Sequence, residues 1–385
     1  LLNGGAAITL NNAGNEFATV DLRARNTADA ANDAGALAYR DATGFDVAAA
    51  NTTSTVTLTG GGAITQSGAA TGTTLTAKTL LNGGAAITLN NAANEFTTVD
   101  LRARNTADGA NDAGALTYRD ATGFDVSGVN TTSTVTLTGG GAITQSGAAT
   151  GTTLTVAAGA LNDITLNNAA NNFGTVAITT GNNVTLVDAN AIDLGTSTVS
   201  GVLGVTAGGD ITQSGALDVA AGASTFTINT ALLADVLIGT QANNFAGQTV
   251  TFNEAAGGTI RDVSLRNTSA VAVYPTITTA GNLRNLTLFY GAGGIALPAT
   301  TVTGTLSVMA GGPITQGGAA AGTTLTAKTM LNAGAAITLN NAGNAFTTVD
   351  LRARNAADNA NAAGAISYRD TDGFDVAAAN TTSTV

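Results

Sequence analysis

The chain contains no cysteine, no histidine and no tryptophan, and it has only three prolines. Without cysteine there is no disulfide framework and no thiolate metal site. Without histidine or cysteine this segment has no Ser-His-Asp triad, no Cys nucleophile and no His general base. We therefore expect no enzyme. A carboxylate pair such as Asp41 with Asp46, acting on a polysaccharide, stays open as an alternative.

Charge is also sparse. Charged residues make up 10% of the chain and the net charge is −11. An acidic balance argues against binding to nucleic acid or to an anionic membrane surface. No run of 18 apolar residues occurs, so we expect no membrane span. The 44% hydrophobic content, mostly small side chains, predicts a folded chain with a thin core.

Near-identical units dominate the sequence. Residues 1–79 form one unit, residues 80–155 a second, and residues 330–385 a partial third. Residues 1–76 and 80–155 align without a gap and differ at seven positions. Residues 156–329 form a diverged region with the same pattern of short runs. We expect residues 1–385 to be one continuous segment of a longer polypeptide, because repeat proteins grow by adding units to a common core.

The short β-type runs are too closely spaced for crossover helices, which parallel βαβ units require. Without a linker between the units, this pattern predicts an all-β parallel β-helix (β-solenoid). We expect about 20 residues per coil and about four coils per 79-residue unit. The three prolines should mark corners or strand starts. In the diverged region we expect strands at residues 164–166, 176–178, 184–186, 191–194, 202–205, 210–213, 217–219 and 226–228.

Two short motifs have structural interpretations. The Ile-Thr-Gln motifs that begin at Ile64, Ile143, Ile211 and Ile314 favour a corner with an inward isoleucine. An Asn-Asn pair follows the same predicted strand in several units, and like residues on successive coils can stack as a hydrogen-bonded ladder. The predicted Asn ladder comprises Asn11, Asn12, Asn90, Asn91, Asn167, Asn168, Asn340 and Asn341.

The most polar stretch of each unit, residues 20–47 in the first copy, is the candidate partner-binding surface. Arginine forks, carboxylates and an aromatic ring repeated on one side of a rod would give multivalent contact. The alternative is a loop excursion whose charges pair locally. The candidate residues are Arg23, Arg25, Asp29, Asp33, Tyr39, Arg40, Asp41, Arg102, Arg104, Tyr118, Arg119 and Asp120.

No cofactor is expected. The Asp and Asn residues between positions 26 and 33 could gather Ca²⁺ through their oxygen atoms, although their spacing matches neither the EF-hand loop nor the calcium-binding nonapeptide. Alternating threonines, as in residues 55–59, suit an outer strand face and leave ice binding as a further alternative.

Residues 208–215 (GGDITQSG) and 163–173 (DITLNNAANNF) resemble the repeat regions of filamentous-haemagglutinin-like adhesins and related β-strand-repeat surface proteins of bacteria. The resemblance implies a right-handed parallel β-helix, exported to the cell surface or medium of a bacterium that we expect to be Gram-negative. It also implies a structural, non-catalytic rod that projects or multiplies adhesive surface, with glycans or proteins of host or neighbouring cells as partners. The alternative is a self-assembling extracellular filament or sheath, in which the chain's main partner is itself.

Overall fold

The computed structural model describes residues 1–219, 221–255, 257–279, 281 and 283–385. These residues form strands, turns and bends, and none of them forms a helix. Parallel strands stack about 22 residues apart and build a β-solenoid of about 14 turns. The prediction of an all-β parallel solenoid is confirmed, and the coil length that we predicted was slightly short.

The chain divides into two compact units, unit 1 (Leu1–Ala189) and unit 2 (Asn190–Val385). The first two sequence copies lie in unit 1, and the third copy lies in unit 2. That the whole chain forms one continuous solenoid stays a prediction. The strands of unit 1 are β1 (Ile8–Leu10), β2 (Thr19–Arg23), β3 (Leu37–Asp41), β4 (Phe45–Asn51), β5 (Thr55–Gly60), β6 (Ile64–Gln66), β7 (Ala70–Leu80), β8 (Ile87–Leu89), β9 (Glu95–Arg104), β10 (Leu116–Asp120), β11 (Phe124–Asn130), β12 (Thr134–Gly139), β13 (Ile143–Gln145), β14 (Ala149–Ala157), β15 (Ile164–Leu166), β16 (Asn172–Thr180) and β17 (Val184–Asp188).

The strands of unit 2 are β18 (Ile192–Leu194), β19 (Ser197–Val199), β20 (Leu203–Ala207), β21 (Ile211–Gln213), β22 (Leu217–Val219), β23 (Ser224–Ile228), β24 (Leu233–Ile238), β25 (Val250–Glu254), β26 (Thr259–Asn267), β27 (Thr276–Thr278), β28 (Asn285–Tyr290), β29 (Ile295–Leu297), β30 (Thr300–Thr301), β31 (Thr305–Ala310), β32 (Ile314–Gln316), β33 (Ala320–Met330), β34 (Ile337–Leu339), β35 (Ala345–Arg354), β36 (Ile366–Tyr368) and β37 (Asp375–Asn380). All eight strands predicted in the diverged region are present, those at 164–166 and 217–219 with the predicted bounds and the others with shifted bounds. β19 and the strands from β24 to β33 were not predicted.

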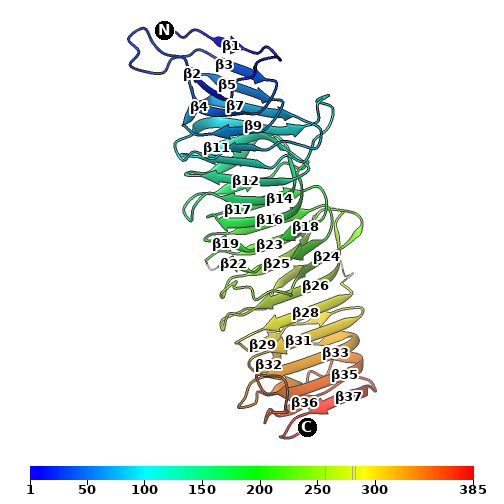
Figure 1. The fold of residues 1–385 in the computed structure, drawn as a ribbon. Helices are drawn as coiled ribbons and strands as arrows, with labels where there is room; N and C mark the ends of the chain where they lie inside the picture. The colour runs from blue at the N-terminus through cyan, green and yellow to red at the C-terminus, as the bar shows by residue number, and fades with distance from the viewer. Residues whose placement is uncertain (220, 256, 280, 282) are drawn as a thin grey trace. The chain divides into compact units, whose positions relative to one another are not determined.

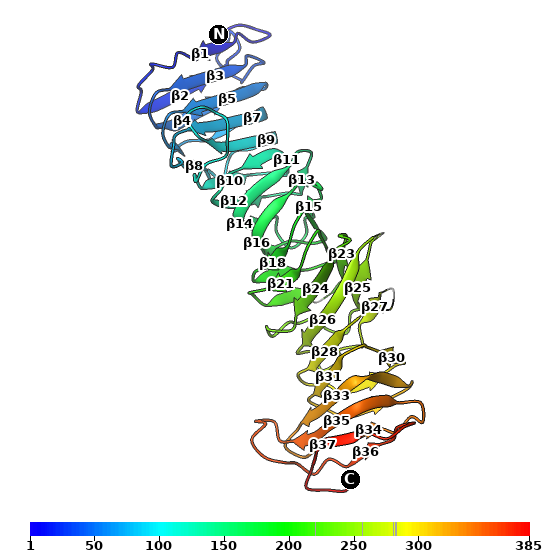
Figure 2. The same cartoon turned by 90° about the vertical axis from the view of Figure 1, so that its right-hand side faces the viewer.

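Unit 1 contains two columns of stacked strands (Figure 1, Figure 2). Odd-numbered strands pair in sequence from β1 to β17 in one column. Even-numbered strands pair from β2 to β16 in the other column. Each turn therefore contributes one odd and one even strand. The chain crosses between the columns along two opposite edges, an even-to-odd edge and an odd-to-even edge. At these edges the end of β4 also pairs with the start of β7, and the end of β11 with the start of β14.

The core lies between the two columns and is made of alternate strand residues. In β5, Val56 and Leu58 are buried while Thr55 and Thr57 are exposed, as expected for a strand with one face inside. The isoleucines of all four Ile-Thr-Gln motifs are fully buried, which confirms that they point inward, but they lie in short strands rather than at corners.

Proline positions also agree with the prediction. Pro275 and Pro313 directly precede β27 and β32, and Pro298 lies between β29 and β30. Proline has no N–H to donate to a ladder, so it occurs where a strand starts or ends.

Each sequence copy contains seven strands, β1–β7 in the first and β8–β14 in the second. With two strands per turn, a copy winds through three and a half turns, and not the four that we expected. An odd number of strands also moves every residue to the other column in the next copy. Leu37 in odd strand β3 corresponds to Leu116 in even strand β10.

Candidate functional site

The polar stretch of each copy forms a loop that projects from one edge of the solenoid. The loops comprise residues 26–34 between β2 and β3, residues 105–113 between β9 and β10, and residues 355–363 between β35 and β36; we call them loops 1, 2 and 3. The turn that contains loop 2 begins at Ile87 and ends where Leu116 pairs with it. The equivalent turn of the diverged region, from Ile164 to its partner Val184, is shorter by the length of the loop. The loop is therefore a nine-residue insertion into a minimal turn.

Each loop is held by its own side chains and by the arginine that precedes it. In loop 1, the Nε atom of Arg25 donates to Asp29 Oδ1 at 3.0 Å, and its other nitrogens donate to Asn32 Oδ1 and to the Asp29 carbonyl. Asn26 Oδ1 accepts from the backbone N–H of Ala30 at 3.0 Å. Asp29 adopts a left-handed conformation with φ of 52°, which Asp tolerates better than most residues. These contacts make the loop a preorganised projection.

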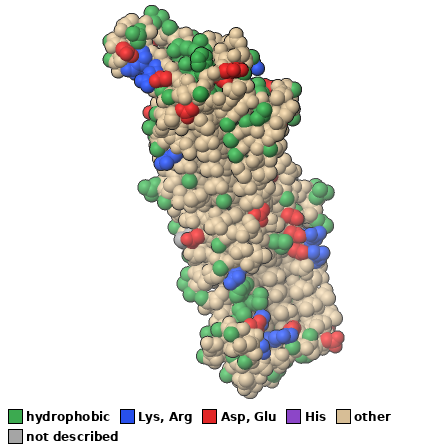
Figure 3. Space-filling model, in the orientation of Figure 1, with side chains coloured by type: hydrophobic (Ala, Val, Ile, Leu, Met, Phe, Trp, Pro, Cys, Tyr) green, Lys and Arg blue, Asp and Glu red, His purple; other side chains and the backbone are tan. Residues whose placement is uncertain are grey.

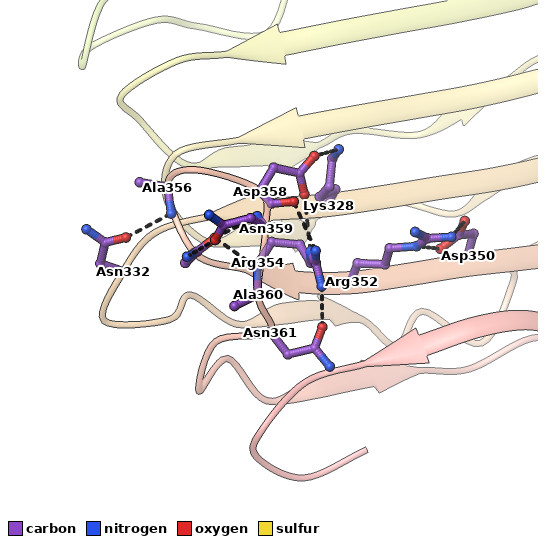
Figure 4. A network of polar contacts seen from close by, with 11 residues as sticks. Lys328, Asn332, Asp350, Arg352, Arg354, Ala356, Asp358, Asn359, Ala360 and Asn361 are labelled. Atoms are coloured by element: carbon purple, nitrogen blue, oxygen red, sulfur yellow. Dashed lines mark hydrogen bonds and ion pairs between the residues drawn. The ribbon is translucent and has the colours of Figure 1, made fainter.

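Loops 2 and 3 each bind a lysine side chain from the preceding turn. Lys78 Nζ lies 2.5 Å from Asp108 Oδ2 in loop 2, and Lys328 Nζ lies 2.6 Å from Asp358 Oδ2 in loop 3 (Figure 4). The hydrogen bond from Lys78, together with Arg104, outweighs burial and lowers the pKa of the Asp108 carboxyl. Lys328 and Arg354 act on the pKa of Asp358 in the same way. These are the only two lysines of the chain.

The remaining arginines of the candidate surface lie on strands or at corners. Arg23 and Arg102 each bind the aspartate two residues earlier, with Nε–Oδ1 distances of 2.7 Å. Arg40 and Arg119 are exposed, and no ion pair of theirs occurs among the described residues. Figure 3 shows acidic and basic side chains next to each other in small clusters. Asp33 accepts from the N–H of Gly4 at 3.0 Å. Most charged side chains of the candidate surface therefore pair with a neighbouring residue.

Four candidate surface residues are buried, so their assignment to a partner-binding surface was wrong. Tyr39 and Asp41 are each 2% exposed, and Tyr118 and Asp120 are 0% and 2% exposed. The Tyr39 hydroxyl donates to Asp41, which also accepts from the backbone N–H and hydroxyl of Thr43. The two residues close the corner between β3 and β4, where Tyr39 packs edge-to-face on Phe45 at 4.8 Å.

The corner of the first copy shifts the pKa of both Tyr39 and Asp41. Burial and the hydrogen bond to Asp41 raise the pKa of the Tyr39 phenol to about 12. Burial alone would raise the pKa of Asp41, but the hydrogen bonds from Tyr39 and Thr43 outweigh it and lower that pKa. Asp41 is therefore an ionised acceptor inside a corner. As an enclosed carboxylate with all of these donors it is also poorly placed to attack a polysaccharide.

The predicted Asn ladder does not form. Equivalent residues of successive copies lie three and a half turns apart in opposite columns, so they cannot stack. The second asparagine of each pair bonds to its own turn: Asn12 Oδ1 accepts from Gly14 N–H, and Asn91 Oδ1 accepts from Ala93 N–H. Asn168 and Asn341 do the same, with Ala170 and Gly343. No side-chain bond of Asn11, Asn90, Asn167 or Asn340 occurs among the described contacts.

A different asparagine, which our sequence analysis missed, joins the turns. Asn94 is 1% exposed, and its Nδ2 donates to Gln66 Oε1, Leu89 O and Arg119 O at 3.0–3.2 Å. Its Oδ1 accepts from Gln66 Nε2 and from Ala70 N–H. One side chain thus connects three successive turns, and we call this arrangement the Asn–Gln clamp.

The clamp recurs wherever an Ile-Thr-Gln motif precedes a later asparagine. Its other members are Gln145 with Asn171, Gln213 with Asn243, and Gln316 with Asn344. The signal was present in the sequence, because this asparagine always lies three residues after an Asn-Asn pair or one after a glutamine-alanine pair. The sequence of an Asn-rich turn does not show which of its polar residues is buried.

The expectation that the candidate surface repeats on one side was also wrong. Loop 1 connects an even strand to an odd strand, and loop 2 connects an odd strand to an even strand. They lie on opposite edges of unit 1, the blue and the cyan projections in Figure 1. The described residues contain no group of three or more acidic side chains that could hold a metal ion. None of them forms a helix long and apolar enough to cross a bilayer.

Comparison with known proteins gives one match. The family model described as repeats of unknown function (DUF5649) matches residues 34–101, 113–180, 181–253 and 283–352. The first two matches start at equivalent positions of the first and second sequence copies. No curated protein and no solved structure matches the chain. Because the four matches cover well over half of its length, the chain belongs to this family of repeats of unknown function.

Proposed function

We propose that this chain is a structural, non-catalytic stalk segment of a large extracellular bacterial surface protein, an adhesin or fibre that projects or multiplies adhesive surface. The observation that carries the proposal is where the recurring polar residues lie. The Asn–Gln clamps and the Tyr–Asp corners are buried and bind neighbouring turns. Residues with the chemistry for a site are thus used to hold the stack together.

The location outside a bacterial cell, and glycans or proteins of other cells as partners of the parent protein, belong to the same proposal. They are supported by the resemblance of the repeats to filamentous-haemagglutinin-like adhesins and by the absence of cysteine, which suits export of an unfolded chain. The loops add rigid, projecting surface to the stalk without a change in its core.

Electron microscopy of the purified chain over a range of concentrations tests the proposal. A stalk gives particles whose axial length is the same at every concentration, and a surface display of the chain beneath a known binding domain extends that domain's reach. Compact globules, or enzymatic release of sugars from polysaccharides by the chain, would overturn it.

The second candidate function is a self-assembling filament subunit. A stack of parallel strands leaves an open backbone ladder wherever it ends, and end-to-end stacking of a second chain would extend that ladder. This candidate predicts particles that grow in axial length as the concentration rises, which the same micrographs would reveal.

A further inference from the structure

A groove lies on the edge of unit 1 opposite loop 2. It has a volume of about 440 Å³ and is lined by residues of the even-to-odd edge, among them Thr73, Glu95, Thr97 and Thr122. Glu95 and Thr97 precede loop 2 by about half a turn, and Thr122 follows it by about half a turn. Loop 2 and the groove are therefore at the same level along the solenoid but on opposite edges.

The same arrangement recurs with the other copies. In unit 2, loop 3 lies on the odd-to-even edge, and a groove of about 210 Å³ next to Ala345, Thr347 and Asp372 lies on the opposite edge. In the first copy, a groove of about 210 Å³ next to Ala13 and Ala42 lies on the edge opposite loop 1, and Thr106 of loop 2 also lines it. Each copy thus brings a projection and a recess to the same level on opposite sides.

The odd number of strands per copy explains how two such chains would fit together. Loop 1 lies on the even-to-odd edge of unit 1 and loop 2 on the odd-to-even edge, and the two loops are displaced by three and a half turns, or about 17 Å along the axis. When two chains lie side by side, parallel and in register, loop 2 of one chain faces the groove on the opposite edge of the other. Asn32 of loop 1 lines part of that groove, so the contact would form next to loop 1 of the second chain.

The surfaces are chemically compatible. The tip of loop 2 carries only short side chains, Thr106, Ala107, Asp108, Gly109 and Ala110, and all five residues are exposed. No cation lines the groove, and Glu95 there is exposed and has no ion pair among the described residues. Lys78 and Arg104 lie at the base of loop 2 and both pair with Asp108, which leaves one net positive charge at this contact. A small tip with a cationic base matches a hydroxyl-lined groove with one carboxylate.

We propose that the chain binds a second copy of itself side by side, through insertion of loop 2 of one chain into the Glu95 groove of the next. The contact uses different surfaces on the two partners, so it repeats without closing and builds a flat array of parallel chains. This inference goes beyond the proposed function: a stalk needs no lateral contact, and an array grows in width while its axial length is unchanged.

Disulfide trapping tests the proposal, because the chain has no cysteine of its own. One preparation carries Ala107→Cys at the tip of loop 2, and another carries Thr97→Cys in the groove. Mixed under mild oxidation, they should give covalent dimers containing one chain of each kind, in several-fold excess over dimers joined through Ala107→Cys on both chains. Thr57→Cys, exposed on the face of β5, is the matched partner that should not cross-link with Ala107→Cys.

A second measurement needs no cysteine. Thr97→Trp fills the groove and Glu95→Lys reverses its charge, and either should abolish the widening of particles with concentration in electron micrographs. Thr57→Trp should leave the widening unchanged. Cross-linking of Thr57→Cys as strong as that of Thr97→Cys, or particles of constant width for the unaltered chain at all concentrations, overturns the lateral contact. Particles of constant length and width would still leave the stalk intact.

Discussion

At the scale of the residue, the recurring buried polar side chains form hydrogen bonds between neighbouring turns. Asn94 is the strongest case, because its buried amide makes five hydrogen bonds to four residues from three turns. A parallel solenoid with a thin core of small side chains gains less from apolar burial than a globular domain of the same length. Buried amides that are fully hydrogen-bonded fix the register between neighbouring turns and also stabilise the stack.

Replacing Asn94 with alanine should destabilise unit 1 by about 2–4 kcal/mol, because it leaves the N–H of Ala70 and two buried carbonyls without partners. Chemical denaturation of the chain measures the loss, and amide exchange at Ala70 should accelerate. Asn90→Ala is the control: it removes an exposed member of the predicted ladder and should change stability by less than about 0.5 kcal/mol. Equal losses would mean that the Asn-Asn pair stabilises the stack after all.

A second prediction at this scale concerns alkaline pH. The folded-state pKa of Tyr39, about 12, lies above the ordinary value of 10.0, so folding favours the neutral phenol. The stability from this corner is complete below about pH 10 and is lost as the pH rises from 10 to about 12. Absorbance of tyrosinate and circular dichroism should therefore change together across this window.

Tyr39 and Tyr118 are the only tyrosines of unit 1, so the double variant Tyr39→Phe, Tyr118→Phe provides the comparison. It loses two hydrogen bonds and should be less stable at neutral pH, but the pH dependence of unit 1 between pH 10 and 12 should become shallower. Tyrosines that ionise near pH 10 while the strands persist would contradict the buried Tyr–Asp corner.

At the scale of the element, a turn that carries a loop differs from a minimal turn by the nine residues of that loop. The minimal turn from Ile164 to Val184 shows that the chain passes from one column to the other with three connecting residues. In loop 2, Asp108 and Asn111 accept hydrogen bonds from Arg104 at the end of β9, and Asp108 also accepts one from Lys78 of the turn before. Side-chain contacts outside the apolar core therefore hold the loop.

Excision of residues 105–113 should accordingly leave the solenoid folded. Joining Arg104 to Gly114 leaves a turn of the same length as the minimal turn, while the loss of Asp112 removes one acceptor of the buried Thr131 hydroxyl. We expect an unchanged far-UV spectrum and a loss of stability of about 1–2 kcal/mol. Removal of the same number of residues from β9 is the control and should unfold the turn. Loss of the fold on loop excision would show that the loop belongs to the core.

Some features of the strands and corners could be predicted from the sequence, and others could not. Strand positions, inward isoleucines and proline positions follow from local propensity and alternation, so they were predicted correctly. Burial of Tyr39 and Asp41 was missed, because a Tyr-Arg-Asp run has the same composition at a corner as on a surface. The roles of Asn12 and Asn94 were confused, because both lie in the same Asn-rich turn and only the fold distinguishes the exposed one from the buried one.

At the scale of the molecule, the sequence repeat and the structural repeat are different lengths, and this decides which surfaces the chain presents. Sequence identity reveals where each copy begins but not the number of turns in it, because turns within the copies differ in length. The turn from Leu37 to Val56 is short, whereas the turn from Ile87 to Leu116 carries a loop. Seven strands per copy place like residues in opposite columns. A surface designed for contact on one side would need an even number of strands per copy.

Distances between spin labels test this winding directly. Thr27 and Thr106, equivalent residues in loops 1 and 2, should lie on opposite edges and be separated by the width of the solenoid as well as by three and a half turns. Thr27 and Thr97 lie on the same edge about three turns apart, or about 14 Å along the axis. Labels at cysteines introduced at these positions should therefore show a clearly longer Thr27–Thr106 distance. If a copy instead wound through four whole turns, both pairs would lie on one edge, with the Thr27–Thr106 pair only about 19 Å apart, and the two-sided array would lose its basis.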